Sequence, residues 1–338
     1  MNEKKIITAK DIAKTCGISQ ATVSYVINNK EGKKISDKTR NLVLETARNL
    51  DYIPNSSART MRTNKSMSIG VVTGRNCINV GFNQVIKGIK RYADAMGYSV
   101  TLLNDDDSDN KDVEYMSYFR ANKIDGILFM FYDMNDSTLT MLEENHIPYL
   151  IINENGVWGK DMEKKKAFVE VINQCAQFCK EKKLKRIRFM SVISNGRAMS
   201  YKYNLFEQAV GQVFPEADFK RIFCQGGSGT NQEIIEQVES YMAEEEFDIV
   251  ITPNQRLGLL TQSAILKKQF VIPQKIKHIC LGASHVFCVM YPTITSVKIQ
   301  LEEMGEYGAI ALLSMIRGEA FEEKAFECIL EYGMSTDL

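Results

Sequence analysis

The residues best placed to do chemistry in this chain are polar side chains within TAKDIAKTCGISQATVSYVINN, residues 8–29. Gln20, Ser24 and Tyr25 are spaced so that they share one face of a short helix. Amide and hydroxyl groups on such a face can hydrogen-bond to the edges of DNA bases. The pattern therefore indicates a helix that reads nucleic acid, provided that its neighbours hold it and leave this face exposed.

Two short helices joined by a tight turn would position these groups. Apolar residues recur at the spacing of two facing helices, at Ile12, Ala13, Ile18, Val23 and Ile27. Gly17 supplies the turn, and Thr8 with Asp11 makes a capping box for the first helix. Ser19 caps the second helix. We predict a helix-turn-helix, whose second helix can enter the major groove of DNA. A three-helix bundle that binds no DNA has the same spacing, so that alternative stays open.

A third helix closes this bundle. Ser36 is a good N-cap, and the following apolar stripe consists of Leu42, Val43, Ala47 and Leu50. The segment DYIP ends the helix, and Asn55 can cap one more short helix, SSARTMR. Such a short helix is unstable alone, so we expect it to order only against a dimer partner and DNA. An ordinary linker is the alternative.

The charge of the chain is divided unevenly along its length. The whole chain has 42 Lys and Arg against 42 Asp and Glu, a net charge of zero. Residues 1–65 contain 13 Lys or Arg and six Asp or Glu, a net +7, which leaves −7 on the remainder. A basic head on an acidic body is typical of a head that meets phosphate and a body that does not.

Composition narrows the class and the compartment. With 338 residues, of which 44% are hydrophobic, the chain can build two or three domains. We expect a cytoplasmic protein, because no stretch is long and apolar enough to span a bilayer and the Lys-rich start lacks the apolar run of a signal peptide. The eight Cys contain no CxxC pair, which favours buried free thiols over a disulfide framework.

The run TAKDIAKTCGISQATVSYVINN, the third helix, and the stretch DYIPNSSARTMRTNKSMSIGVV together resemble the LacI/GalR family of bacterial transcriptional regulators. The resemblance implies DNA contacts at Thr8, Ser19, Gln20, Ala21, Thr22, Ser24, Tyr25, Asn28, Asn55, Ala58, Arg59 and Met61. Gln20, Ala21 and Tyr25 would face base edges, and Thr22, Ser24 and Asn28 would hold phosphates.

The resemblance also implies a hinge helix over residues 55–62. Ala58 and Arg59 would lie in the minor groove, and Met61 would take the place of the family's usual Leu wedge, which opens the central base step. Tyr25 departs from the Arg that the family usually carries to read guanine, because Tyr has no bidentate fork. Operator preference at that base pair would differ accordingly.

From Met67 onward, short apolar runs such as SIGVVT, YSVTLLN, IDGILFM, IPYLIIN, RIRFMSV, FDIVIT and KIKHICLG alternate with helical stretches. This alternation predicts doubly wound parallel sheets. The closing segment YPTITSVKIQLEEMGEYGAIALLSMIRGE again resembles the family. The expected fold is an N-terminal all-α helix-turn-helix domain followed by an α/β periplasmic-binding-protein-like domain of two parallel-sheet subdomains, which flank a cleft and are linked by three crossings.

The expected domain boundaries follow from these motifs. The headpiece covers 1–54, the hinge helix and linker 55–66, and the effector-binding and dimerisation domain 67–338. Within the last of these, the N-subdomain is expected at about 67–157 and 289–318, and the C-subdomain at about 158–288 and 319–338.

The cleft of this chain differs from that of the sugar-responsive relatives. Those relatives usually carry one Arg and two Asp that hydrogen-bond to hydroxyl groups, and the matching positions here are Lys202, Gln255 and Ser284. Without those acceptors, a conventional sugar is disfavoured. Asn254 adds a polar group, and the aromatic faces of Phe82 and Trp158 can stack on a ligand ring at the cleft mouth. Core packing of either aromatic side chain is the alternative.

Other constellations give weaker signals. The Gly-rich turn QGGSGTNQE lacks a Walker Lys and Rossmann spacing. His278, Cys280, His285 and Cys288 match no common zinc motif. Cys175 and Cys179, one helical turn apart, indicate a packed helix face rather than a redox pair. The three His are scattered, and no paired carboxylates stand out. We therefore expect no catalytic residues, no cofactor and no metal.

These patterns predict a homodimeric regulator of transcription, most simply a repressor, that binds a near-palindromic operator in double-stranded DNA. A small molecule in the cleft would control it. Two rival hypotheses stay open. One is a DNA-binding regulator with no small-molecule effector, whose body serves for dimerisation. The other is a ligand-sensing module with a degenerate head.

Overall fold

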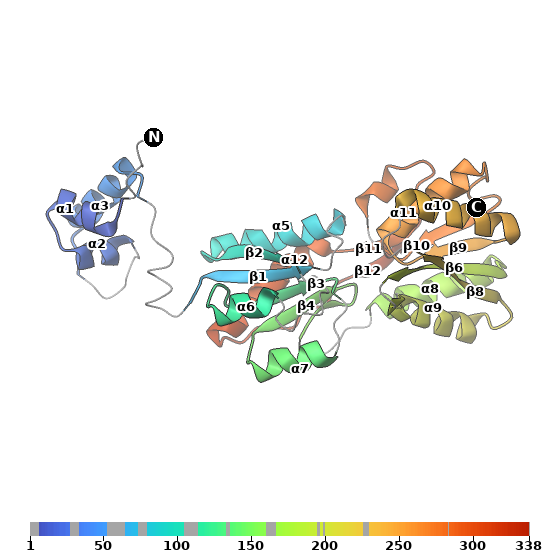
Figure 1. The fold of residues 1–338 in the computed structure, drawn as a ribbon, viewed down its shortest axis with the longest axis horizontal. Coiled ribbons are helices and arrows are strands. Elements are labelled where there is room, and N and C mark those ends of the chain that lie inside the picture. Colours follow the sequence, from blue (N-terminus) through green and yellow to red (C-terminus); the bar gives the residue numbers. More distant parts are fainter. Residues whose placement is uncertain are drawn as a thin grey trace. The chain divides into compact units, whose positions relative to one another are not determined.

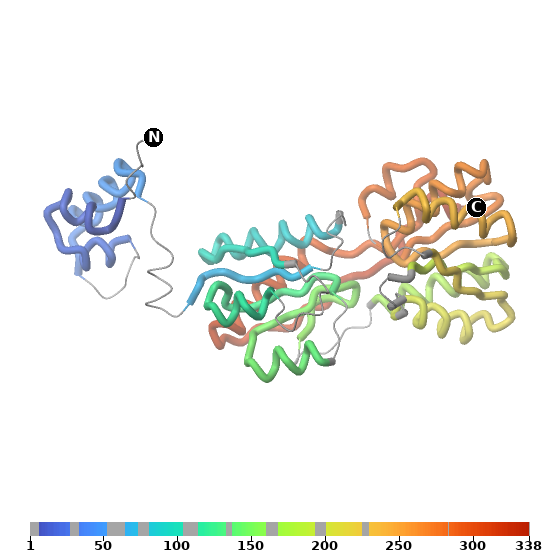
Figure 2. The backbone as a smooth tube through the Cα atoms, viewed as in Figure 1, coloured from blue at the N-terminus to red at the C-terminus, as the bar shows by residue number. Residues whose placement is uncertain are grey.

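The structure is a computed structural model that describes residues 7–27, 34–52, 65–73, 80–104, 114–132, 136–159, 167–194, 197–198, 200–225, 230–282 and 284–337. The chain divides into two compact units, Met1–Met67 and Ser68–Leu338. Figure 1 shows the helices and strands, and Figure 2 traces the backbone of each unit. The predicted hinge helix, residues 55–62, lies outside the described residues.

The first unit contains the predicted helix-turn-helix and its third helix: α1 (Ala9–Cys16), α2 (Gln20–Ile27) and α3 (Asp37–Asn49). The capping box of Thr8 and Asp11 is present, and Gly17 ends α1 in the left-handed conformation with a φ of 67°. Ser19 accepts a hydrogen bond from the backbone N–H of Thr22, and Ser36 caps α3.

The core of this unit combines residues from all three helices, namely Ile12, Ala13, Val23, Val26, Val43 and Ala47. Leu42 departs from the sequence prediction, because it is 45% exposed in place of lying in the apolar stripe. The side chains at 43 and 47 lie one helical turn apart and fill the space between the helices. Leu42 therefore projects away from them.

The second unit begins with a five-stranded sheet in the order β2-β1-β3-β4-β5. The strands are β1 (Ser68–Thr73), β2 (Ser99–Asn104), β3 (Ile127–Met130), β4 (Tyr149–Asn153) and β5 (Gly156–Trp158), and all neighbours are parallel except β4 and β5. Phe129 and Ile151 face α6 (Glu114–Arg120) and α7 (Asp136–Glu144). Leu128 and Ile152 contact a helix on the other face. Both faces are covered, which explains the continuous apolar runs of these strands.

That other face is covered by α5 (Val80–Ala95) and α12 (Leu301–Arg317), which pack against each other although they are distant in sequence. Two glycines permit the close approach. A Cβ atom at Gly88 would lie 1.9 Å from the backbone oxygen of Glu302, and one at Gly305 would lie 2.0 Å from that of Val85. The helices can cross this closely only because neither position has a side chain.

A seven-stranded sheet follows in the order β12-β11-β10-β9-β6-β7, with β8 paired to β6. Its strands are β6 (Arg186–Ser194), β7 (Arg197–Ala198), β8 (Asp218–Gln225), β9 (Ile249–Thr252), β10 (Lys277–Cys280), β11 (Thr295–Ile299) and β12 (Cys328–Glu331). Helices α8 (Ala167–Glu181) and α9 (Ser200–Val213) share a core with Ile249 and Ile251 on one face. Helices α10 (Asn231–Glu244) and α11 (Gln255–Lys267) pack with Val250 on the opposite face. The fold is the predicted pair of parallel-dominated sheets.

The chain crosses from one sheet to the other at positions that differ from the predicted subdomain boundaries. The N-subdomain was expected to resume at 289, but β11 pairs with β10 of the second sheet, so the chain crosses only at Gln300, before α12. It returns before β12, which pairs with β11. Trp158 was expected to open the C-subdomain, yet β5 pairs with β4 of the first sheet. A strand pattern shows neither which sheet a strand joins nor where the chain crosses.

Among the described residues, no helix is both long enough and apolar enough to cross a membrane.

Candidate functional site

In the first unit, the side of α2 that carries Gln20, Ala21 and Tyr25 is at least partly exposed to solvent. Val23 and Val26 are buried against the other two helices, which fixes the rotation of α2 about its axis. Gln20 and Ala21 are consequently exposed, and Tyr25 is half-buried. Lysines on the same unit, at 10, 14, 34 and 38, are exposed as well. A small polar helix face within a basic unit fits a DNA duplex.

The predicted contact residues differ in what else they do. Thr22 and Ser24 are half-buried, whereas Thr8 and Ser19 are exposed but shape helix starts: Thr8 Oγ1 donates to Asp11 Oδ2 at 2.6 Å, and Ser19 Oγ lies 2.9 Å from Thr22 Oγ1. The remaining predicted contacts, Asn28, Asn55, Ala58, Arg59 and Met61, lie outside the described residues.

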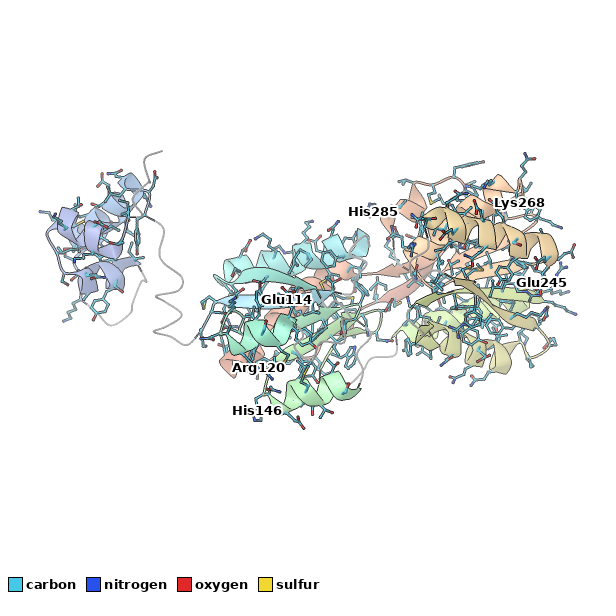
Figure 3. All side chains as sticks on the ribbon, in the orientation of Figure 1. Glu114, Arg120, His146, Glu245, Lys268 and His285 are labelled. Atoms are coloured by element: carbon cyan, nitrogen blue, oxygen red, sulfur yellow. The ribbon has the colours of Figure 1, made fainter. Side chains whose placement is uncertain are left out.

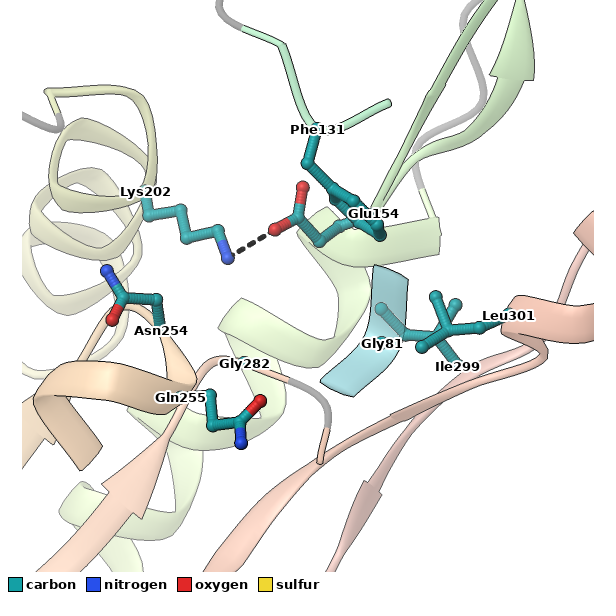
Figure 4. A pocket seen from close by; sticks show the side chains of 9 residues that line it. All are labelled: Gly81, Phe131, Glu154, Lys202, Asn254, Gln255, Gly282, Ile299 and Leu301. Carbon is teal, nitrogen blue, oxygen red and sulfur yellow. Dashed lines mark ion pairs between the residues drawn. The ribbon is translucent and has the colours of Figure 1, made fainter. Parts of the chain in front are cut away.

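The second unit has a pocket where its two sheets meet. About 340 Å³ of empty space, which includes open solvent, is lined by Gly81, Phe131, Glu154, Lys202, Asn254, Gln255, Gly282, Ile299 and Leu301. Figure 4 shows these residues coming from both subdomains. Glu154 follows β4 and Asn254 follows β9, so both lie beyond the carboxyl ends of parallel strands. Ligand sites of open α/β sheets form at such ends.

Lys202 dominates the chemistry of this pocket. Its Nζ donates to the backbone oxygens of Pro253 at 2.9 Å and Leu281 at 3.1 Å, and it pairs with Glu154 Oε1 at 2.5 Å. Figure 4 shows this ion pair spanning the pocket. The ammonium also lies 5.1 Å from the centre of the Phe168 ring. Only 7% of Lys202 is exposed, so these contacts replace water around its charge.

The ion pair keeps the carboxyl group of Glu154 charged. Burial acts to raise the pKa of Glu154, but the charge of the Lys202 ammonium and its hydrogen bond outweigh burial, so this pKa lies below its ordinary value. Next along the chain, Asn155 Nδ2 donates to the hydroxyl of Tyr201 at 3.2 Å. The turn between β4 and β5 is thus tied twice to the start of α9.

The six residues predicted to bind an effector are divided by the structure. Lys202, Asn254 and Gln255 line the pocket. Phe82 is only 8% exposed and lies beside the pocket residue Gly81, outside the lining. Trp158 packs against the core of the first sheet, as the core-packing alternative expected. Ser284 caps the short helix His285–Cys288, accepting a hydrogen bond from Val286 N–H.

Sequence reasoning missed two pocket residues that matter chemically, Glu154 and Phe131. Each directly follows a parallel strand, β3 for Phe131 and β4 for Glu154. The rule that sites form at the carboxyl ends of such strands could have found both. The ion-pair partner of Glu154 could not have been found in this way, because it lies on a helix of the other subdomain.

The His and Cys near β10 have structural partners. His278 is fully buried, with Nε2 3.0 Å from Thr252 Oγ1 and Nδ1 2.9 Å from Gln262 Oε1. Burial lowers its pKa to about 3. His285 begins the short helix His285–Cys288, which follows β10 (Figure 3). Within the described ranges, no three metal-binding side chains are grouped together.

The remaining candidates are also parts of helices. Cys175 and Cys179 are fully buried in the core beneath α8, and burial raises the pKa of Cys179 to about 12. They form the packed face predicted from their spacing. In the Gly-rich motif, Thr230 makes a capping box with Glu233 at the start of α10. Residues 226–229 of that motif lie outside the described residues.

Comparison with known proteins agrees with both units. The family of "Bacterial regulatory proteins, lacI family" matches residues 8–55, and "Periplasmic binding proteins and sugar binding domain of LacI family" matches residues 66–287. The chain belongs to the LacI family. The family resemblance predicted from sequence is confirmed, and with it a DNA-binding regulator of transcription.

Relatives of this LacI-family chain match it over nearly its whole length. It is 27% identical to catabolite control protein A of Streptococcus mutans, over 99% of this chain and 98% of that protein. It is 24% identical to the HTH-type transcriptional repressor PurR of Vibrio atlanticus, over 95% of each. A structure of the lac repressor dimer bound to operator and an anti-inducer has a TM-score of 0.79 at 19% identity, covering 98% of this chain and 99% of that one. This last likeness shows the shared fold.

Proposed function

We propose that this LacI-family regulator is a repressor that binds a near-palindromic operator as a homodimer. The proposal rests on one observation: a face of α2 that exposes Gln20 and Ala21 and leaves Tyr25 half-buried, within a basic unit, is joined in one chain to a pocket between two subdomains. The names of relatives support it, since one is a transcriptional repressor and another is a repressor dimer bound to operator. We further propose that it acts in the cytoplasm and is no enzyme.

Specificity would come from α2 and the hinge. Gln20, Ala21 and Tyr25 would contact base edges, while Thr22, Ser24 and Asn28 would contact phosphates, which give affinity without sequence information. The predicted wedge, Met61, would insert at the central base step. Control would be a population shift, in which a ligand in the pocket changes the angle between subdomains and thereby the affinity for operator.

The first experiment selects fragments of the source genome with the full-length protein at a stated salt concentration. A repressor of this kind should enrich a near-palindrome with half-sites about one helical turn apart. Gln20→Ala should weaken binding to the enriched site far more than binding to random DNA. Lys268→Ala, on the second unit (Figure 3), is the matched control and should change neither.

Met61→Gly tests the wedge in the same assay. The change removes an apolar side chain and lowers helix propensity by about 1 kcal/mol, so specific binding should fall more than non-specific binding. Equal losses on operator and random DNA would contradict the wedge. Enrichment of no sequence at all would contradict the repressor itself and favour a sensing module with a degenerate head.

A second candidate function is a DNA-binding regulator with no small-molecule effector. The Glu154–Lys202 ion pair favours it, because the chain's own side chains fill part of the pocket. A thermal-shift screen with sugars, sugar phosphates, nucleobases and amino acids separates the two. A ligand at 100 times its dissociation constant stabilises the folded state by about 2.7 kcal/mol, and no shift with any compound would favour the effector-free regulator.

A further inference from the structure

The ammonium group of Lys202 has all of its donors in use. A lysine ammonium has three N–H groups, and here they meet three oxygens, those of Pro253, Leu281 and Glu154. The two backbone oxygens follow β9 and β10 in the same subdomain as Lys202. The carboxylate of Glu154 comes from the other subdomain. Of the three partners, Glu154 alone carries charge.

A ligand that enters this pocket therefore meets an ion pair, and its own charge decides what binding costs. A neutral hydroxyl group placed between the two residues would separate opposite charges where little water screens them, which is unfavourable. A carboxylate or phosphate would replace one anion on Lys202 with another. Glu154, whose side chain is 22% exposed, could then turn toward water, whereas the more deeply buried Lys202 could not.

The rest of the lining agrees with an anion at this position. Asn254 and Gln255 line the pocket where α11 begins, and the amino end of a helix carries partial positive charge. The opposite wall is apolar, formed by Phe131, Ile299 and Leu301. This combination suits a compact molecule with one anionic group and an uncharged body.

We propose that the pocket takes a small molecule bearing a carboxylate or phosphate, which binds by displacing Glu154 from Lys202. This inference rests on the proposed regulatory role of the pocket and names its ligand class. Glu154 then competes with the ligand for Lys202. Without ligand, the ion pair between Glu154 and Lys202 joins the two subdomains. Because Asn155 contacts Tyr201 beside the pair, displacement of Glu154 acts on the junction between the subdomains.

The test titrates the full-length protein with sodium phosphate and, separately, with sodium acetate by calorimetry, with ionic strength held constant by sodium chloride. Glu154→Gln removes the competing charge and keeps the side-chain shape. Its affinity for at least one of the two anions should exceed that of the wild type by tenfold or more. Comparison of the two titrations tells a phosphate site from a carboxylate site.

Two variants at Lys202 and one control complete the design. Lys202→Met should abolish anion binding, and Lys202→Arg, which keeps the charge, should retain it. Glu331→Gln breaks the exposed ion pair with Lys298, whose atoms lie 3.2 Å apart, and should bind anions as the wild type does. Circular dichroism checks folding, and if Lys202→Met does not fold, the comparison between Glu154→Gln and the wild type decides.

The proposal is overturned if Glu154→Gln binds both anions no tighter than the wild type, or if folded Lys202→Met binds them equally well. It is also overturned if the wild type binds neutral glucose while Glu154→Gln binds neither anion. The outcome is separate from that of the repressor proposal, because operator binding is measured without any anion titration. If the protein binds an anion but enriches no operator, the proposed ligand class is supported and the repressor proposal is refuted.

Discussion

The contact between α5 and α12 gives a prediction whose size follows from the structure. In Gly305→Ala, the new Cβ atom would lie 2.0 Å from the backbone oxygen of Val85, whereas atoms in ordinary contact lie about 3.5 Å apart. The helices must therefore separate by roughly 1.5 Å. The displaced oxygen belongs to the backbone, so no side chain can rotate to relieve the clash.

Separation of the helices also loosens contacts that α12 makes along its buried face. A gap of 0.5–1 Å forfeits about a quarter to a half of the dispersion energy of each affected atom pair. Overpacking by itself costs about 1–3 kcal/mol, so we expect Gly305→Ala to lower the free energy of unfolding by about 3 kcal/mol or more. Gly211→Ala in α9 is the matched control, since its Cβ atom meets no atom within 4 Å. It should raise that free energy by about 0.4–1 kcal/mol.

Urea unfolding followed by tryptophan fluorescence measures both changes. Trp158 is the chain's single Trp, and it packs against the core of the first sheet, so its signal reports on the subdomain that α12 covers. With a urea slope of about 3 kcal/mol per M, Gly305→Ala should lower the midpoint by about 1 M. A midpoint within about 0.2 M of the wild type, or equal shifts in both variants, would show that the helices do not cross this closely.

Three further predictions concern other parts of the chain. Ser36→Ala should destabilise α3 by about 1 kcal/mol, seen as faster hydrogen exchange in that helix; unchanged exchange would mean the cap is not formed. Burial lowers the pKa of His278 from its ordinary value of 6.5 to about 3, so between these pH values the imidazole binds a proton only in the unfolded chain. The free energy of unfolding should therefore fall as pH drops from 6.5 to 3. In urea unfolding at several pH values, His278→Gln should reduce the slope of this free energy against pH by about 1.4 kcal/mol per pH unit. A parallel slope in both proteins would contradict this. Exposed Cys288 should react quickly with a thiol reagent, whereas buried Cys175 and Cys179 should react only upon unfolding, and fast labelling of either would refute their burial.

Local patterns were predicted well because neighbouring residues determine them. The cap of α1 depends on Thr8 and Asp11, three positions apart, and the structure has both of its hydrogen bonds. The apolar runs of the strands follow from coverage of both sheet faces. The predicted role of Leu42 in the apolar stripe was wrong, because the exact facing of a helix depends on where its neighbours lie.

Predictions that depended on distant partners were less complete. The strand Thr295–Ile299 was assigned to the wrong subdomain, because its pattern does not say which sheet it pairs with. Trp158 has the residue type that stacks on ligands, yet its place on β5 puts it against the first sheet's core. Lys202 was found through the family resemblance, and its partner Glu154 was not found.

The sequence by itself determined the helix-turn-helix, the family and the alternation of strands and helices, since caps, turn glycines and apolar periods act over a few residues. Only the tertiary structure decided which charged side chains meet in the pocket. Glu154 and Lys202 belong to separate subdomains, and nothing in either local stretch indicates that they meet at 2.5 Å. Their pairing arises from the packing of two sheets whose relative placement depends on every crossing of the chain. That long-range contact sets the charge a ligand encounters.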